Sequence, residues 1–120
     1  MGTKYQQGYG FENRIVRKLN EQGGLAYRTA GSHSPIDITY LAKDFTFLIQ
    51  CKHSKKKDID INAILCDDNT LKLEQLITAP HIIKIILMKQ ARSNKIIQLR
   101  YSNDWRTSQP WVLTSHLDLT

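Results

Sequence analysis

Hydrophobic residues recur with a helical period near the N-terminus and in strand-like runs over most of the remaining chain. Residues 11–22 have a helical pattern, and the glycines at 23 and 24 are a natural end for it because glycine tolerates the left-handed conformation. A short strand is predicted at 25–29, and the composition of 30–35 is typical of a loop. Residues 1–10 contain three glycines and no periodic pattern, so we expect a mobile arm there.

The rest of the chain alternates between β-rich runs and polar segments. Two β-rich runs, 36–41 and 45–52, are joined by three residues and predict a β-hairpin. A polar, irregular stretch follows from residue 55. A helix is then expected at 71–78, after capping residues at 67–70. The later elements are expected to be two strands, at 82–90 and 95–101 around a turn at 92–94, and a short strand at 111–113. This order predicts one domain over residues 1–120 of the α/β or α+β class, with a mixed sheet flanked by helices.

The composition indicates the class of binding partner and the cellular compartment. The chain has 17 Lys and Arg against 11 Asp and Glu, a net charge of +6 that favours a polyanionic partner. Its two cysteines lack the spacing of a metal knuckle or redox motif, which is typical of a reduced intracellular protein. Because no signal peptide and no membrane-spanning run is evident, we expect a cytoplasmic protein without a membrane partner.

Glu12 is the charged residue that lies on the apolar side of the first predicted helix. On a helical wheel, Phe11, Ile15, Val16 and Leu19 form one arc and Glu12 falls inside it. Burying an unpaired carboxylate is costly, so Glu12 is expected to have a cation or a metal as its partner. The alternative is a place at the edge of the arc, in reach of water or an arginine.

The predicted hairpin brings together Asp37, Gln50 and Lys52. Side chains alternate along a strand, so Gln50 and Lys52 share one face at the end of the second strand, opposite a wholly apolar face. Asp37 begins the preceding strand, and pairing around the short turn places it close to both. Each residue alone could have an ordinary structural role, but the three in this order and facing favour a common site.

An acid, an amide and an amine at one point suit the hydrolysis of phosphodiesters. Asp37 can supply a carboxylate, Gln50 a neutral side-chain oxygen and Cys51 its backbone carbonyl to Mg²⁺, which prefers hard oxygen ligands. Lys52 can orient or deprotonate the attacking water and offset negative charge on the phosphate. We therefore expect a Mg²⁺-dependent nuclease in which Mn²⁺ is able to substitute.

The segments Pro35-Ile36-Asp37 and Gln50-Cys51-Lys52 resemble the motif of the PD-(D/E)XK nuclease superfamily. Within it the chain is most similar to archaeal-type Holliday junction resolvases, through Gly10-Phe11-Glu12, the segment RTAGS at 28–32 and the near-identical spacing of these parts. The likeness covers roughly residues 8–57. It implies an α/β fold with a restriction-endonuclease-like core, and a two-fold homodimer that resolves four-way DNA junctions by paired phosphodiester hydrolysis.

The same resemblance implies roles for individual residues. Glu12 is an active-site acid and a further candidate metal ligand, Ser32 is a loop hydroxyl near the scissile phosphate, and Asp37, Gln50 and Lys52 are the core catalytic set. The chain departs from the resolvases at Gln50, where they usually carry glutamate, and its Gln-x-Lys form is similar to restriction endonucleases of the Mrr type. Glutamine keeps the oxygen ligand but removes a charge, so metal affinity falls unless Glu12 compensates.

Two other functions stay open beside the junction resolvase that we expect. They are a restriction- or repair-type endonuclease acting on duplex DNA, and a catalytically inactive DNA-binding module of the same fold. Candidate DNA contacts are Lys4 and Tyr5 on the arm, Arg28, the loop residue His33, and a basic cluster of His53, Lys55, Lys56 and Lys57. A dimer surface could involve Ile96, Ile97 and Leu99, or the region of Trp105 and Trp111, and the sequence does not decide between them.

Overall fold

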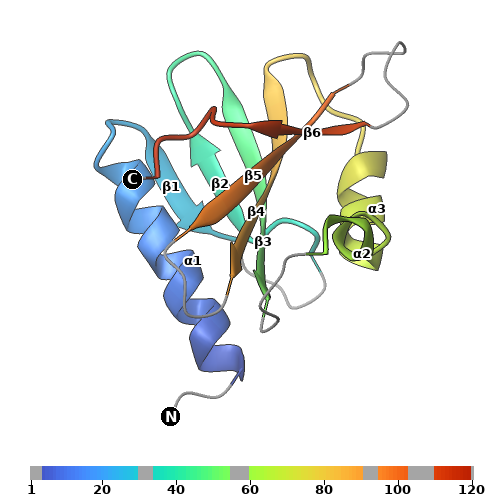
Figure 1. Ribbon diagram of the computed structural model, residues 1–120. Coiled ribbons are helices and arrows are strands. Elements are labelled where there is room, and N and C mark those ends of the chain that lie inside the picture. The colour runs from blue at the N-terminus through green and yellow to red at the C-terminus, as the bar shows by residue number, and fades with distance from the viewer. Residues whose placement is uncertain (1–3, 30–33, 55–59, 91–94, 103–109, 120) are drawn as a thin grey trace.

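The computed structural model describes residues 4–29, 34–54, 60–90, 95–102 and 110–119, with only the backbone described for residues 4–9. In chain order the helices and strands are α1 (Lys4–Asn20), β1 (Leu25–Arg28), β2 (Ile38–Leu41), β3 (Thr46–Ser54), α2 (Ile61–Leu65), α3 (Asp68–Gln75), β4 (Ile82–Gln90), β5 (Ile96–Tyr101) and β6 (Trp111–Thr114) (Figure 1). No helix among the described residues is long and apolar enough to cross a membrane.

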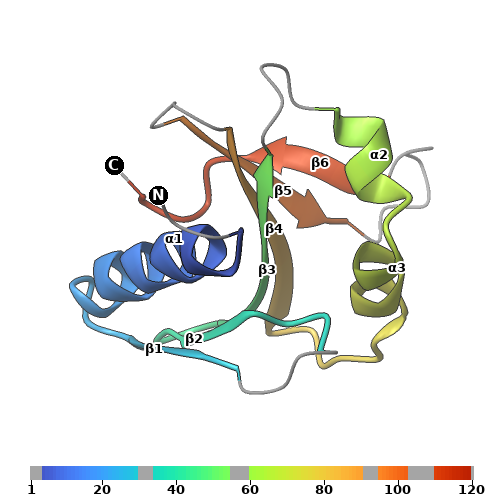
Figure 2. The same cartoon turned by 90° about the horizontal axis from the view of Figure 1, so that it is seen from below.

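All six strands form one sheet, in the same order in space as along the chain. Neighbouring strands are antiparallel except β3 and β4, which run parallel and are connected through α2 and α3. Figure 2 shows the sheet between two layers, with α1 over one face and α2 and α3 over the other. The predicted class, α/β with a mixed sheet flanked by helices, is therefore confirmed.

Two hydrophobic clusters hold these layers together. The larger lies between α1 and the sheet, where Phe11, Ile15 and Leu19 are buried, as their helical spacing predicts. The smaller lies beneath α2 and α3 and contains Ile64 and Leu73. Because successive side chains of a strand point to opposite faces, β3 and β4 contribute to both clusters, and β4 is apolar over most of its length.

The hairpin of β2 and β3 has the expected register. Ile38 pairs with Ile49 and Leu41 with Thr46, so the two strands separate at the end that carries Asp37 and Gln50. The backbone amide of Asp37 donates to the carbonyl of Ile49, with N and O 2.8 Å apart. The predicted proximity of Asp37 to β3 thus follows from the ladder itself.

The end of α1 depends on the two glycines. Gly23 has a φ of 95°, which L residues with a side chain rarely adopt. A Cβ at position 24 would lie 2.6 Å from the carbonyl oxygen of Leu41 and 2.5 Å from a ring carbon of Tyr40. The first glycine therefore provides the turn, and the second lets the chain approach β2.

The helices differ from their predicted bounds. α1 begins at Lys4, so the expected arm is helical from that residue, because a helix already anchored on the core can extend through glycines that cost only about 1 kcal/mol each. The stretch expected to be irregular contains α2, which starts after the N-cap Asp60. α3 has the predicted length but lies three residues earlier in the chain, from Asp68 to Gln75, and ends well before Pro80. These segments have weak periodicity, and tertiary packing decides their bounds.

Candidate active site

Asp37 lies where β2 and β3 separate, and its carboxylate takes part in the strand pairing. Oδ2 accepts a hydrogen bond from the backbone amide of Cys51 at 2.8 Å. The pKa of Asp37 is raised to about 6, mainly by burial. The hydrogen bond from Cys51 lowers the pKa and the carboxylate of Glu12 raises it. The cations of Lys52 and Arg28 lower it. The charges of Glu12, Lys52 and Arg28 thus all act on one carboxyl group, as expected if these residues surround it.

Glu12 is partly buried at the side of α1 and forms an ion pair with Arg28. Its Oε2 lies 2.8 Å from Nε of Arg28, and the Glu12 side chain is only 17% exposed. Arg28 is the last residue of β1, so this contact joins α1 to the strand that leads into the active-site loop. Glu12 is only partly buried and its partner is an arginine, as in the alternative of a place at the edge of the apolar arc. This arginine is a residue that the sequence assigned to DNA binding.

Gln50 is more deeply buried than an exposed strand face would allow. The residue is 2% exposed. Its Nε2 donates to the backbone carbonyl of Pro35 at 3.3 Å, and its Oε1 faces the hydroxyl of Thr70 at 3.2 Å. Gln50 therefore shares the α2 and α3 face of the sheet with Lys52, as predicted, but is covered by α3 and not by solvent.

Lys52 forms an ion pair with Asp67 at the start of α3. Its Nζ lies 2.9 Å from Oδ1 of Asp67, the N-cap of α3. Asp67 also accepts the backbone amide of Asn69 at 2.8 Å. Partial burial would raise the pKa of Asp67, but the hydrogen bonds from Lys52 and from Asn69 hold it below its ordinary value. Lys52 points to the helix and not into the hydrophobic interior.

Cys51 alternates with these two residues and lies on the other face. Its side chain packs against the larger cluster, and burial, with the carboxylates of Asp37 and Glu12 adding to it, raises the pKa of the thiol well above its ordinary value. A thiol under these conditions stays protonated, so it is neither a nucleophile nor a thiolate ligand. Only the backbone of Cys51 belongs to the candidate site.

Several predicted contacts lie outside the described residues. They are Ser32 and His33, the lysines at 55–57, and the side chains of Lys4 and Tyr5, whose backbone begins α1. His53 is described, on β3 and partly buried. Of the candidate dimer residues, Leu99 and Trp111 are buried in the smaller cluster, Ile96 and Ile97 are partly buried, and Trp105 is outside the described part.

Thr70 and Asp67 are the site neighbours that the sequence did not single out for such a role. The sequence identified 67–70 as helix-capping chemistry, and Asp67 does cap α3. A capping motif does not reveal which strand the cap lies against, so no local signal pointed to Gln50 or Lys52.

A cavity lies elsewhere in the described part of the chain. It has a volume of about 710 Å³ and opens beside the C-terminal end of α3, lined among others by Leu76, Ile77, Lys84, Tyr101 and Val112. None of the candidate site residues lines it. A protein that binds a DNA phosphate backbone uses an accessible surface and not an enclosed pocket. This cavity is therefore not the expected place for phosphodiester hydrolysis.

The donor atoms fit a hard divalent cation. Among the described residues, no three His, Cys, Asp or Glu side chains form a group that could hold a metal ion. The expected ligand set contains only two such side chains, Glu12 and Asp37, and is completed by the oxygens of Gln50 and the Cys51 backbone. All four are oxygen donors of the kind that Mg²⁺ prefers, and the pKa of Asp37, raised by burial and then by a second carboxylate, indicates a place where a cation would relieve repulsion.

An acid directly before β2, an amide and a lysine two residues apart on β3, and a mixed sheet between helices define a nuclease of the PD-(D/E)XK class. A family model described as archaeal Holliday junction resolvase (Hjc) matches residues 3–116, and the chain belongs to this family. It is therefore a Holliday junction resolvase, a nuclease that acts on DNA. Nucleases of this family generally use divalent metal ions.

One similar solved structure is that of Archaeoglobus fulgidus Hjc, a Holliday junction resolvase from an archaeal hyperthermophile. It is 19% identical, with a TM-score of 0.49, and the match covers 74% of this chain and 72% of that chain. Among curated proteins no sequence match is found.

Proposed function

We propose that this resolvase hydrolyses DNA phosphodiesters with Mg²⁺ held by Asp37, Gln50 and the backbone carbonyl of Cys51, with Glu12 close by. The proposal is carried by the surroundings of Asp37, whose carboxylate accepts from the Cys51 amide at 2.8 Å and whose pKa is shifted by the charges of Glu12, Lys52 and Arg28. Catalytic groups commonly have perturbed pKa values.

The hydrogen bond between Cys51 and Asp37 supports the third ligand. In an extended strand the N–H and C=O of one residue point to the same side. Since the Cys51 amide donates to Asp37, the Cys51 carbonyl is directed to the side of β3 on which that carboxylate lies. A divalent ion, when bound, supplies Lewis-acid polarisation of the scissile phosphate.

The remaining residues act on charge and position. Lys52 is paired with the carboxylate of Asp67. In the proposed site it orients the attacking water and offsets charge that develops on the phosphate. Arg28 balances Glu12 beside the strand that leads to the loop of Ser32. Ser32, His33, Lys4, Tyr5, His53 and the lysines at 55–57 are proposed to contact the DNA.

Junction cleavage with Mg²⁺ or Mn²⁺ tests the proposal, using wild type, Asp37→Ala and Asp44→Ala. Asp44 is the matched control because it is an exposed aspartate at the other end of the same hairpin. We expect paired nicks across a four-way junction with wild type and Asp44→Ala, and junction binding without cleavage with Asp37→Ala. Equal cutting of linear duplex would favour the restriction- or repair-type alternative. Tight binding by wild type without cutting under either metal would indicate an inactive DNA-binding module.

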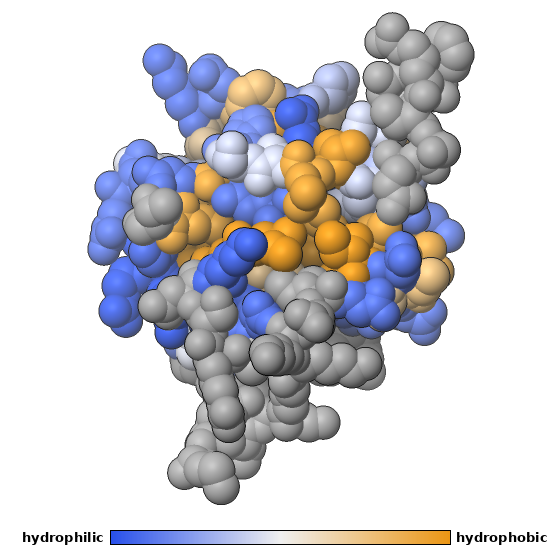
Figure 3. All heavy atoms as spheres, viewed as in Figure 1, coloured by the Kyte–Doolittle hydropathy of each residue, from blue (hydrophilic) through white to orange (hydrophobic). Residues whose placement is uncertain are grey.

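We further propose that the protein acts as a homodimer, because paired nicks on a two-fold junction need two centres. Figure 3 shows hydrophobic side chains over the middle of the face on which β5 and β6 lie in Figure 1. Leu113, on the edge strand β6, is 69% exposed, and an unpaired strand edge readily accepts a second copy. Light scattering should give twice the chain mass for wild type and one chain for Leu113→Lys; a monomeric wild type that makes paired nicks would overturn this point.

A further inference from the structure

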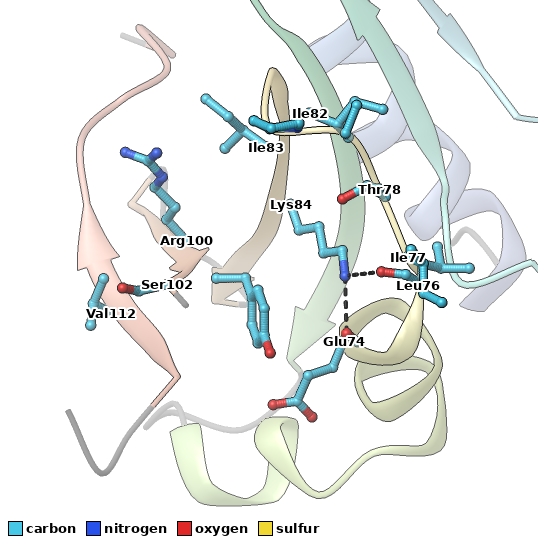
Figure 4. A pocket seen from close by; sticks show the side chains of 13 residues that line it. Glu74, Leu76, Ile77, Thr78, Ile82, Ile83, Lys84, Arg100, Ser102 and Val112 are labelled. Carbon is cyan, nitrogen blue, oxygen red and sulfur yellow. Dashed lines mark hydrogen bonds between the residues drawn. The ribbon is translucent and has the colours of Figure 1, made fainter. Parts of the chain in front are cut away.

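Helix α3 is attached to the sheet at both of its ends. At its C-terminal end, Nζ of Lys84 donates to the backbone carbonyls of Glu74 and Leu76, at 2.9 and 2.6 Å (Figure 4). Lys84 is 5% exposed, and its ammonium lies 4.9 Å from the ring centroid of Tyr101. A cation placed on the last carbonyls of a helix is favourable, so Lys84 fixes this end of α3 to β4.

At its N-terminal end, α3 meets two site residues of β3. Asp67 pairs with Lys52 at 2.9 Å, and the hydroxyl of Thr70 lies 3.2 Å from Oε1 of Gln50. Asp67 is held in place by its capping bond to the amide of Asn69, and Thr70 is fully buried. The first turn of one helix therefore contacts both the amide and the amine of the nuclease motif.

The orientation of the Gln50 amide is determined by its neighbours. The Pro35 carbonyl can only accept, so the nitrogen of Gln50 must face it and Oε1 must face Thr70. The single hydroxyl proton of Thr70 has a second acceptor, the carbonyl of Ile64, at 2.7 Å. The Thr70 hydroxyl lies nearer to the Ile64 carbonyl than to Oε1, which is 3.2 Å away, so Oε1 stays in contact with Thr70 and keeps acceptor capacity for a further ligand.

We propose that Asp67 and Thr70 are positioning residues for the nuclease site, with Asp67 directing the Lys52 ammonium and Thr70 directing the Gln50 carboxamide. The inference rests on the proposed roles of Gln50 and Lys52 and identifies the residues that keep these two side chains in position. A partly exposed ion pair contributes little to stability, but it restricts a side chain that has four rotatable bonds. The two contacts are expected to affect the cleavage rate through the placement of Lys52 and Gln50, because small displacements of a catalytic group lower the rate strongly.

Asp67→Asn separates positioning from capping. Asparagine is as good an N-cap as aspartate, so the helix keeps its cap while Lys52 loses its anionic partner. Asp60→Asn is the matched control, since Asp60 caps α2 in the same way, accepting from the amide of Ala63. We expect kcat for junction cleavage to fall about 10- to 100-fold with Asp67→Asn, at nearly unchanged KM and unfolding temperature, and to stay within about twofold of wild type with Asp60→Asn.

The result that would overturn the role of Asp67 is a kcat near wild type, or one above it, which would make the ion pair an inhibitory contact. Lys52→Met distinguishes this failure from failure of the proposed function. If Lys52→Met abolishes cleavage but Asp67→Asn does not lower it, only the positioning role is wrong. If Lys52→Met cleaves normally, the proposed catalytic role of Lys52 is itself wrong.

Thr70 is tested without metal through the side-chain amide of Gln50. In nuclear magnetic resonance spectra recorded with EDTA, the NH₂ signals of Gln50, identified by their loss in Gln50→Glu, should be shifted from those of exposed glutamines. Thr70→Val removes the hydroxyl at nearly constant volume and should move these signals and lower kcat. Thr70→Ser keeps the hydroxyl and should restore both. Equal spectra and rates for the valine and serine variants would overturn the role of Thr70.

Discussion

The carboxylate of Asp37 accepts the backbone amide proton of Cys51, with Oδ2 2.8 Å from N, at the point where β2 and β3 part. The side chain thereby takes the place of a backbone acceptor in the hairpin and is held at the end of the sheet. Burial still raises its pKa to about 6, because one hydrogen bond does not replace the lost hydration. The first prediction follows from this cost.

Without metal, Asp37→Asn should stabilise the protein above pH 6. The carboxyl pKa is higher in the folded chain, about 6, than its ordinary 3.8, so the unfolded chain loses its proton first and wild-type stability falls as pH rises through this window. Asparagine does not titrate and can still accept from Cys51. We expect a gain of about 1–2 kcal/mol in the free energy of unfolding at pH 7.5, reduced because the group is partly exposed, and none below about pH 4.

Urea unfolding in EDTA across pH 4–8 measures this difference. Asp44→Asn, on the exposed hairpin turn, should follow wild type throughout. Saturating Mg²⁺ should remove or reverse the gain, because only the wild-type carboxylate gains stability from the bound ion. A gain that persists at pH 4 would show that it does not come from ionisation of Asp37.

The second prediction concerns Gln50→Glu, which restores the acid of the related resolvases. In this chain the carboxylate would lose the bond to the Pro35 carbonyl and become a buried anion. In EDTA we expect a loss of about 2 kcal/mol in the free energy of unfolding. With metal, the extra charged ligand should recover this loss and give cleavage at low Mg²⁺ at least equal to that of wild type.

Gln98→Glu is the matched control for that experiment. Gln98 is also buried on a strand, where it bonds the backbone of Leu117 through both its nitrogen and its oxygen. Its substitution should lower stability by a similar amount but show no recovery with Mg²⁺. Thermal unfolding with and without metal distinguishes the two variants, and recovery in both would argue against Gln50 as a metal ligand.

A third prediction concerns the buried lysine of β4. Lys84→Met keeps the length and apolar stem but leaves the carbonyls of Glu74 and Leu76 without their donor. We expect a loss of about 1–3 kcal/mol in the free energy of unfolding. Lys72→Met, at an exposed position of α3, should change it by less than about 0.5 kcal/mol. If the two variants unfold alike in denaturant, Lys84 does not anchor the helix.

The fourth prediction concerns DNA binding by Lys55, Lys56 and Lys57. Replacing all three by alanine should weaken junction binding and lower the slope of log K against log salt by about 2–3, since each phosphate contact contributes about 0.9. Lys43→Ala, at the far end of the hairpin, should leave the slope near that of wild type. Fluorescence anisotropy between 50 and 200 mM salt gives both slopes. An unchanged slope in the triple variant would remove this cluster from the DNA interface.

The sequence by itself determined the β-hairpin, the facing of Gln50 and Lys52, and the strands at 82–90 and near 95–101. It left two places open for Glu12, one buried with a cation or metal and one at the edge of the apolar arc, and the structure shows a partly buried Glu12 paired with Arg28. These features depend on the period of side chains along a helix or strand, and on the cost of burying a charge. Both can be evaluated from neighbouring residues alone.

Only the tertiary structure decided which distant residues complete the site. Gln50 contacts Thr70, and Lys52 pairs with Asp67. These residues meet because the connection from β3 to the parallel strand β4 runs through α2 and α3 on one face of the sheet. The same crossover buries Gln50, which strand alternation alone left open to solvent. Periodicity determines the side of an element on which a residue lies, but not which other element covers that side, since this follows from how the whole chain packs.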